Sequence, residues 1–319
     1  MTLATTQPNW DYLTSTPDLL VSNLSHLGLI EVTGEQGKTF IHGQVTTDIV
    51  SLTETQWRWG AHCDPKGKMI ASFRTYTVAD SLFVLMPASV LPLSLASWQK
   101  YAVFSKAELT DVTAKHVILG FAGSQAAQFI EQQFGPVEHE VTHAEGAIIL
   151  KDAERFMVIT SAEKAQQLVA ASNQPLSHCQ AWQALEIQAG YANIDDNHSS
   201  EFVPQMCNIQ AVNGISFEKG CYMGQETIAR MKYRGGNKRA LYILSGSASE
   251  TVSSETQIEI ASEDGFLRAG KVIEAVELNG QVLLTAVLAN DTPNDATLRV
   301  KDDSQSELVV KPLPYSLED

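Results

Sequence analysis

Residues 219–226, with the sequence KGCYMGQE, are the part of this chain best suited to chemistry. Gly220 and Gly224 allow a tight backbone turn whose main-chain N–H groups face outward. The stretch precedes an expected helix, and a cysteine near both a helix N-terminus and a cation has its thiolate form favoured. Lys219 supplies the cation and Cys221 the thiol. The pattern predicts an exposed, reactive thiol on a loop.

The alternative for Cys221 is a buried thiol packed as a small apolar side chain, which is the commoner place for a free cysteine. Its neighbours are glycine, lysine and tyrosine rather than valine or leucine, so exposure is favoured. No histidine lies near in sequence to act as its base, so the reaction stays open. Glu226, at the start of the helix, is expected to complement the helix macrodipole or to pair with Lys219 or Arg230.

Residues 62–68, with the sequence HCDPKGK, bring a histidine, a cysteine and an acid together. Adjacent side chains of a strand point to opposite faces, which is poor geometry for one metal ion. A hairpin tip is the better interpretation, with Asp64 capping the turn and Lys66 and Lys68 solvated. A position beside a ligand pocket is the alternative.

The helices and strands that must position these residues are of two kinds: mixed α+β units in the first part of the chain and short β-strands in the last part. Up to about residue 237, two successive α+β units with antiparallel hairpins favour layers of the ferredoxin-like, split-βαβ kind. From Arg239, six short alternating strands separated by turn signals predict a small antiparallel β-barrel. The expected strands are 24–33, 58–63, 69–78, 82–86, 116–123, 147–151, 156–160, 240–244, 256–260, 265–276, 281–288, 297–300 and 307–310; the expected helices are 35–49, 89–101, 124–134, 161–172, 180–189 and 227–233.

Length and composition limit the class of protein. A chain of 319 residues with 44% apolar residues predicts two or three folded domains. The four cysteines form no C-x-x-C pair, which argues against a disulfide framework or a self-contained metal site and favours a reducing compartment. No Lys or Arg precedes Lys38, and the apolar stretch 82–98 is interrupted by two prolines. A soluble cytoplasmic protein without membrane association is expected.

The net charge of −15 opposes broad binding to nucleic acid. Basic residues are nevertheless concentrated at Lys219, Arg230, Lys232, Arg234, Lys238 and Arg239. This segment is either a solvated helix face or a local anion site suited to a polyglutamate tail or a phosphate.

The stretch 219–226, continued to residue 241, resembles the signature of the YgfZ family of bacterial folate-binding proteins. Further matches are QVTTD, AHCDPKGK, KYAVFSK and PLPYSLE, which begin at Gln44, Ala61, Lys100 and Pro312. The resemblance covers nearly the whole chain.

The resemblance implies the fold of the glycine-cleavage T-protein, with two α+β domains and a C-terminal β-barrel around a folate channel. We expect a discontinuous first domain over 20–110 and 180–237, a second over 111–179 and the barrel over 238–319. The family implies binding of tetrahydrofolate or a derivative, support of iron–sulfur cluster assembly or repair, thiolation of some tRNAs and a link to replication initiation. The implied partners are iron–sulfur proteins or their assembly machinery, met transiently, and direct tRNA binding is not expected for so acidic a chain.

Carried over to this chain, the resemblance implies that Cys221 is the functional cysteine and Lys219 its motif neighbour. From residue type alone Trp182 is a core residue, but the resemblance implies a folate-contacting aromatic. Leu27 stands where the best-known members have a second folate-contacting Trp. Gln188 stands where related folate enzymes have a glutamate, so it can hydrogen-bond to the pterin but not pair with it as an anion.

Two other functions remain open. A one-carbon transferase of the T-protein type requires an acid near the folate nitrogen, for which Asp64 is the nearest candidate, and it gives no role to Cys221. Direct RNA binding by residues 230–239 predicts affinity that falls steeply with salt.

Overall fold

The computed structural model describes residues 3–8 and 16–317 of the chain. Two compact units share these residues, and each unit is assembled from separate segments. Unit 1 comprises Met1–Ile41, Ile49–Arg58 and Arg74–Trp182, and unit 2 comprises His42–Asp48, Trp59–Phe73 and Gln183–Asp319. The expected division into three domains stays a prediction. No helix within 3–8 and 16–317 is long and apolar enough to cross a membrane.

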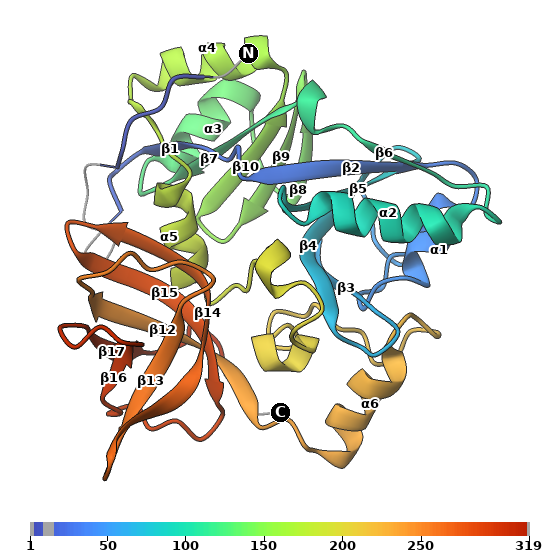
Figure 1. Cartoon of the computed structure of the whole chain (residues 1–319). Helices are drawn as coiled ribbons and strands as arrows, with labels where there is room; N and C mark the ends of the chain where they lie inside the picture. The colour runs from blue at the N-terminus through green and yellow to red at the C-terminus, as the bar shows by residue number, and fades with distance from the viewer. Residues whose placement is uncertain (1–2, 9–15, 318–319) are drawn as a thin grey trace. The chain divides into compact units, whose positions relative to one another are not determined.

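A six-stranded sheet forms one layer of unit 1 (Figure 1). In spatial order its strands are β11 (Leu176–Ser177), β1 (Leu20–Asn23), β7 (Val117–Ala122), β10 (Arg155–Thr160), β9 (Ala147–Asp152) and β8 (Val141–Ala144). Helices α3 (Ala126–Phe134) and α4 (Ala162–Ser172) cover one face and bury apolar side chains against β7 and β10. The side chain of Ser161 accepts a hydrogen bond from the backbone N–H of Lys164 and thereby caps the N-terminus of α4.

A second sheet has the order β3-β4-β5-β2-β6. Its strands are β2 (Leu27–Thr33), β3 (Arg58–Cys63), β4 (Met69–Val78), β5 (Ser81–Pro87) and β6 (Glu108–Asp111). Helix α2 (Leu91–Ala102) packs against β2 and β6 in unit 1. The boundary between the units falls within β3 and β4, so the hairpin tip that joins these strands belongs to unit 2.

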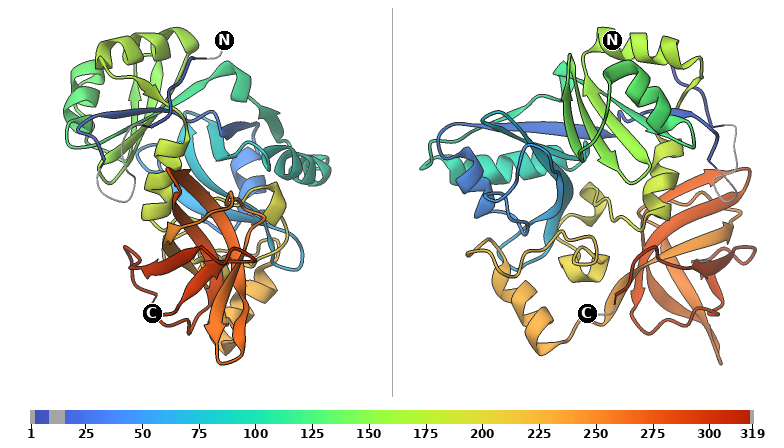
Figure 2. Two further views of the ribbon diagram at one scale, coloured as in Figure 1. Left: turned by 60° about the vertical axis from the view of Figure 1, so that its left-hand side comes forward. Right: turned by 180° about the vertical axis from the view of Figure 1, so that it is seen from behind.

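The C-terminal strands close into a six-stranded antiparallel barrel in the order β12-β15-β14-β13-β16-β17 (Figure 2). Apolar side chains that alternate along each strand fill its interior. The expected α+β fold with a C-terminal barrel is therefore confirmed. The strands are β12 (Arg239–Ser247), β13 (Gln257–Ser262), β14 (Gly265–Leu278), β15 (Gln281–Ala289), β16 (Leu298–Val300) and β17 (Glu307–Lys311).

Two sequence-based expectations near the N-terminus are wrong. The strand expected over 24–33 begins only at Leu27, because residues 24–26 form a turn, and the strand β1 before that turn was not expected. The helix expected over 35–49 is only α1 (Gly37–His42). After His42 the backbone leaves the helix, and Val45 forms a β-bridge with His62 instead. The remaining helices are α5 (Gln180–Gln188) and α6 (Gln225–Arg234), both close to expectation.

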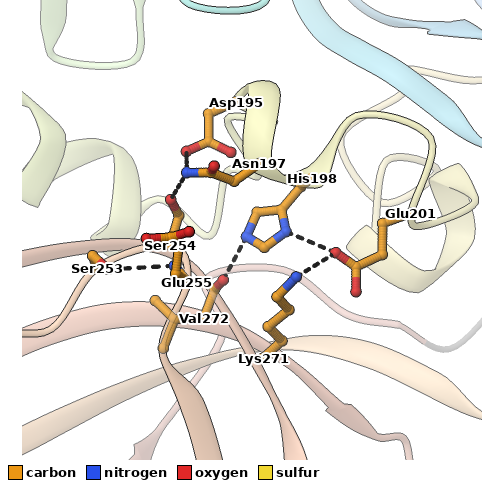
Figure 3. A network of polar contacts seen from close by, with 9 residues as sticks. All are labelled: Asp195, Asn197, His198, Glu201, Ser253, Ser254, Glu255, Lys271 and Val272. Atoms are coloured by element: carbon orange, nitrogen blue, oxygen red, sulfur yellow. Dashed lines mark hydrogen bonds and ion pairs between the residues drawn. The ribbon is translucent and has the colours of Figure 1, made fainter.

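A partly buried network of polar contacts ties the segment after α5 to the barrel within unit 2 (Figure 3). His198 is fully buried; its Nε2 lies 2.7 Å from the carbonyl oxygen of Val272 and its Nδ1 lies 3.0 Å from Oε2 of Glu201. Nζ of Lys271 donates to the same carboxylate oxygen at 2.8 Å. Both ring nitrogens of His198 therefore lie beside oxygen atoms, and Glu201 joins the imidazole to Lys271.

The same segment pairs with Met69, the first residue of β4 after the tip of the β3–β4 hairpin. The backbone N–H of Ser200 donates to the carbonyl oxygen of Met69 at 2.6 Å, and the N–H of Met69 donates to that of Phe202 at 2.7 Å. The hairpin is thus connected to barrel strand β14 through residues 198–202.

Glu274 of β14 is a buried carboxyl at a second junction inside unit 2. It accepts hydrogen bonds from Nε2 of Gln183 at 2.9 Å and from Nδ2 of Asn193 at 3.0 Å. The pKa of Glu274 is raised to about 7, chiefly by burial and also by the charges of Glu186 and Asp195, whereas the two amide donors oppose the shift.

A raised pKa in the folded state makes stability fall as the pH rises, because the unfolded chain loses its proton first. We expect the wild type to lose up to about 3 kcal/mol relative to Glu274→Gln between about pH 4.5 and pH 7. Urea unfolding at several pH values measures this difference. Glu263→Gln, at an exposed acid of the barrel, is the control; parallel stability curves for wild type and Glu274→Gln would contradict the shift.

Candidate functional site

The loop that precedes α6 exposes its cysteine to solvent. Cys221 is exposed, whereas Cys63 and Cys207 are buried and Cys179 is half-buried. The next residue, Tyr222, is buried in an apolar cluster of unit 2, so the chain is anchored immediately after the thiol. The predicted exposure of Cys221 on a loop is confirmed.

Lys219 holds this loop against residues 42–47 of the same unit. Its ammonium donates to the carbonyl oxygens of His42, Val45 and Thr47, the last two at 2.8 Å. An ammonium has three hydrogens, so the three carbonyls use all of them. Lys219 therefore positions the loop, and its donors are directed at the backbone of residues 42–47 rather than at the neighbouring thiol.

The protonation state of Lys219 depends on two opposing effects. Burial lowers its pKa to about 8, while the charge of Asp48 raises it. The three carbonyl oxygens also favour the ammonium, because only the charged form has three N–H groups to donate. Asp48 is itself fixed by His42, whose Nδ1 lies 3.2 Å from its carboxylate.

Thr46 links residues 42–48 to strand β3 and to the segment before Cys221. Its hydroxyl donates to the carbonyl oxygen of Gly214 at 2.6 Å and accepts from the N–H of Ala61 at 2.9 Å. Farther along, the N–H of Met223 donates to the carbonyl oxygen of Gly43 at 3.1 Å. Residues 219–224, which we call the thiol loop, are therefore held by residues 42–48 on both sides of Cys221.

The β3–β4 hairpin tip supports the end of the thiol loop. Gly224 has φ of +81° and lies so close to the tip that a Cβ would stand 2.7 Å from both the carbonyl oxygen of Asp64 and Cα of Gly67. Gly67 is restricted in the same way, since its Cβ would stand 2.8 Å from Thr227. Gly220, by contrast, has open space around it.

The hairpin tip has the structure expected from its sequence. Oδ1 of Asp64 accepts from the backbone N–H groups of Lys66 at 2.8 Å and Lys68 at 3.0 Å, and both lysine side chains are exposed. The neighbouring His62 and Cys63 are buried, and burial lowers the pKa of His62 to about 3. Residues 3–8 and 16–317 contain no group of three or more His, Cys, Asp or Glu side chains that could hold a metal ion.

Helix α6 is anchored on its buried side. Nε2 of Gln205 donates to the carbonyl oxygen of Ile228 at 2.7 Å, and Nδ2 of Asn237 donates to that of Gln205 at 3.0 Å. Glu226 pairs with Arg230 at 2.7 Å on the exposed side, which confirms one of its two predicted ion pairs.

Trp182, an expected folate contact, is fully buried in unit 1. Its ring packs on the backbone of Gly120, where a Cβ would stand 2.3 Å from Cε3, and the guanidinium of Arg155 lies 5.4 Å from the ring centre. Within the described chain its indole N–H has no hydrogen-bond partner. Buried donors of this kind are usually satisfied by ordered water or by another bound acceptor.

The other two expected folate contacts differ in their surroundings. Leu27 is buried in unit 1 and lines a hollow of about 200 Å³ together with Leu24, Leu29 and His116. This volume is below the roughly 300 Å³ where small-molecule pockets begin, so the hollow is too small to enclose a whole folate. Gln188 is exposed at the end of α5. The roles of Leu27, Trp182 and Gln188 stay predictions.

His26 is a polar residue of unit 1 that the sequence analysis did not single out. The residue is partly exposed, but both of its ring nitrogens are buried, and neither has a hydrogen-bond partner in the part of the chain that the structure describes. Burial, with the nearby charge of Arg74 and His178, lowers its pKa to about 3, so the ring is neutral. Its loop position, one residue before Leu27, gives no sequence pattern by which it could have been found.

Comparison with solved structures identifies the fold. The chain superposes on the glycine cleavage system aminomethyltransferase T of Bartonella henselae with a TM-score of 0.73, covering 95% of this chain and 88% of that one at 15% identity. The protein therefore has the fold of the T-protein class.

Sequence comparison identifies the family. The chain is 42% identical over 308 residues to the tRNA-modifying protein YgfZ of Yersinia pestis (strain Pestoides F), covering 94% of this chain and 93% of the relative. Identity and coverage are the same for that of Yersinia enterocolitica serotype O:8 / biotype 1B. The family model of the YgfZ β-barrel domain matches residues 237–303. The chain belongs to the YgfZ family.

The two glycines of the thiol loop differ in what they tolerate. We expect Gly224→Ala to lower the free energy of unfolding by about 1–3 kcal/mol, because it places a side chain at positive φ against the hairpin tip. Gly220→Ala is the matched control and should stay within about 0.5 kcal/mol of the wild type. Urea unfolding measures both, and equal stabilities would contradict the close contact of Gly224 with Gly67.

Proposed function

We propose that this protein is a cytoplasmic, folate-binding accessory protein that supports iron–sulfur cluster assembly or repair and thereby the thiolation of some tRNAs. The observation that carries the proposal is the exposed Cys221 on a loop fixed by Lys219, in a chain whose family relatives are named tRNA-modifying proteins. One thiolate cannot hold a cluster alone, so Cys221 meets the cluster or sulfur of another protein transiently.

Tetrahydrofolate or a derivative is the cofactor that the T-protein fold suggests. Two buried polar groups of unit 1 support a bound ligand of this kind: the indole N–H of Trp182 and the imidazole of His26, each without a hydrogen-bond partner among residues 3–8 and 16–317. A pterin offers both acceptors and donors to such groups. When bound, tetrahydrofolate would supply one-carbon chemistry at its reduced ring.

A one-carbon transferase of the T-protein type is less well supported. Asp64, the acid proposed for it, already caps the hairpin turn through two backbone N–H groups. That function also leaves the exposed Cys221 without a role.

The thiol is tested in a bacterial strain that lacks its own homologue. We expect the wild type and Cys179→Ser to restore tRNA thiolation and the activity of an iron–sulfur enzyme, and Cys221→Ser to leave both at the level of the empty vector. Mass spectrometry of tRNA nucleosides and an aconitase assay are the measurements. Full restoration by Cys221→Ser would contradict the proposal. It would favour the alternative, a one-carbon transferase, because aminomethyl transfer does not need the thiol.

Folate binding is tested by calorimetry with tetrahydrofolate. Trp182→Phe keeps an aromatic ring but removes the N–H, so we expect affinity to fall about tenfold, which corresponds to about 1.4 kcal/mol. Trp98→Phe, at an equally buried tryptophan of α2, is the control for the loss of ring volume. Equal affinities for the two variants would contradict the assignment of Trp182.

A further inference from the structure

Helix α6 and the residues that follow it expose a basic and aromatic surface in unit 2. We call it the α6 basic face, and it consists of Arg230, Lys232, Tyr233, Arg234, Lys238 and Arg239, all exposed. Residues 230–239 hold five of the 22 Lys and Arg residues and no acid, which leaves 17 basic against 37 acidic residues elsewhere in the chain. Such a reversal of charge on an acidic protein is typical of an interaction site.

The surface is shaped as well as charged. A hollow of about 270 Å³ is lined by Glu226, Ala229, Arg230, Tyr233 and Arg234. Tyr233 is 71% exposed, and its ring meets that of Phe217 edge-on at 6.4 Å. Exposed tyrosine and arginine side chains are the types enriched in the hot spots of protein interfaces.

The helix that carries this face is fixed before any partner arrives. Ile228, on the opposite side of α6, is fully buried, and Gln205 and Asn237 hold the helix through the hydrogen bonds described above. A surface fixed in advance loses little conformational entropy when it binds.

We propose that the α6 basic face docks an acidic segment of the protein whose sulfur or cluster Cys221 serves; this inference rests on the proposed function. Helix α6 has ten residues and is therefore about 15 Å long. Aspartate and glutamate side chains can pair with its arginines in the bidentate manner of carboxylates. A tRNA would extend far beyond so short a surface and meet an acidic chain, so a compact acidic segment fits the charge distribution better.

The position of the face in the chain is close to Cys221, so a partner docked on the face can contact the thiol. Only three residues separate Cys221 from the first residue of α6, Gln225. An extended segment of ten residues spans about 33 Å, so a partner segment lying along α6 also reaches past its N-terminal end.

The test uses two synthetic peptides of ten residues, one of Asp and Glu and one of Ser and Gly, each ending in a cysteine bound to 2-thiopyridine as a mixed disulfide. The Cys221 thiolate attacks the peptide sulfur, a protein–peptide disulfide forms and 2-thiopyridone leaves with the electron pair of the broken bond. Its absorbance gives the second-order rate constant, and Cys221→Ser gives the background of the other cysteines.

At low salt we expect the acidic peptide to react about tenfold faster than the neutral one, and added salt to abolish the difference. The double variant Arg230→Gln/Arg234→Gln should lose the preference. Lys115→Gln/Arg268→Gln, which removes two exposed positive charges elsewhere, should keep it. Equal rates for both peptides with the wild type would overturn the docking surface and leave the thiol function intact.

Two further measurements complete the test. If neither peptide reacts, the proposed thiol function fails. The docking surface is then tested separately by the fluorescence anisotropy of a labelled acidic peptide without cysteine. The wild type and Lys115→Gln/Arg268→Gln should bind this peptide, and Arg230→Gln/Arg234→Gln should not. If a single-stranded RNA of ten nucleotides suppresses the preference at lower concentration than the free acidic peptide, the face binds nucleic acid and the proposal is overturned.

Discussion

The ammonium of the partly buried Lys219 makes the interaction on which the arrangement of the thiol loop depends. Three carbonyl oxygens between His42 and Thr47 converge on it. Carbonyls inside a helix accept bonds from their own helix, so this convergence is compatible only with a chain that leaves the helix at His42. The short α1, the course of residues 42–48 and the outward position of Cys221 are consequences of one charged group that needs three acceptors.

Support for the loop extends from there to the barrel. The glycine contact between Gly224 and Gly67 sets the thiol loop on the hairpin tip, and Met69, which follows the tip, is hydrogen-bonded to Ser200 and Phe202. His198 and its ionic partners connect that segment to β14. The barrel therefore contributes to the site as a rigid support, although none of its strands carries the thiol.

The parts of this architecture that the sequence predicts are those encoded locally. Alternation of apolar residues predicts the barrel strands, and glycine and lysine beside Cys221 predict its exposure. The role of Lys219 and the end of α1 depend on partners 172–177 residues apart, which no local pattern reveals. The sequence also does not show that the polar nitrogens of Trp182 and His26 are buried and have no hydrogen-bond partner among the described residues. Both properties depend on how the surrounding chain packs and not on the residue type.

The long separation between Lys219 and its acceptors also determines when the site can form during synthesis. Unit 2 contains His42–Asp48 and Trp59–Phe73, but most of it is Gln183–Asp319. The early segments leave the ribosome far ahead of the lysine, and their carbonyls are hydrogen-bonded to water until it arrives. Closure of so long a loop is slow compared with local folding. The geometry around Cys221 is thus a late product of folding, and a nascent chain that ends before residue 219 cannot contain it.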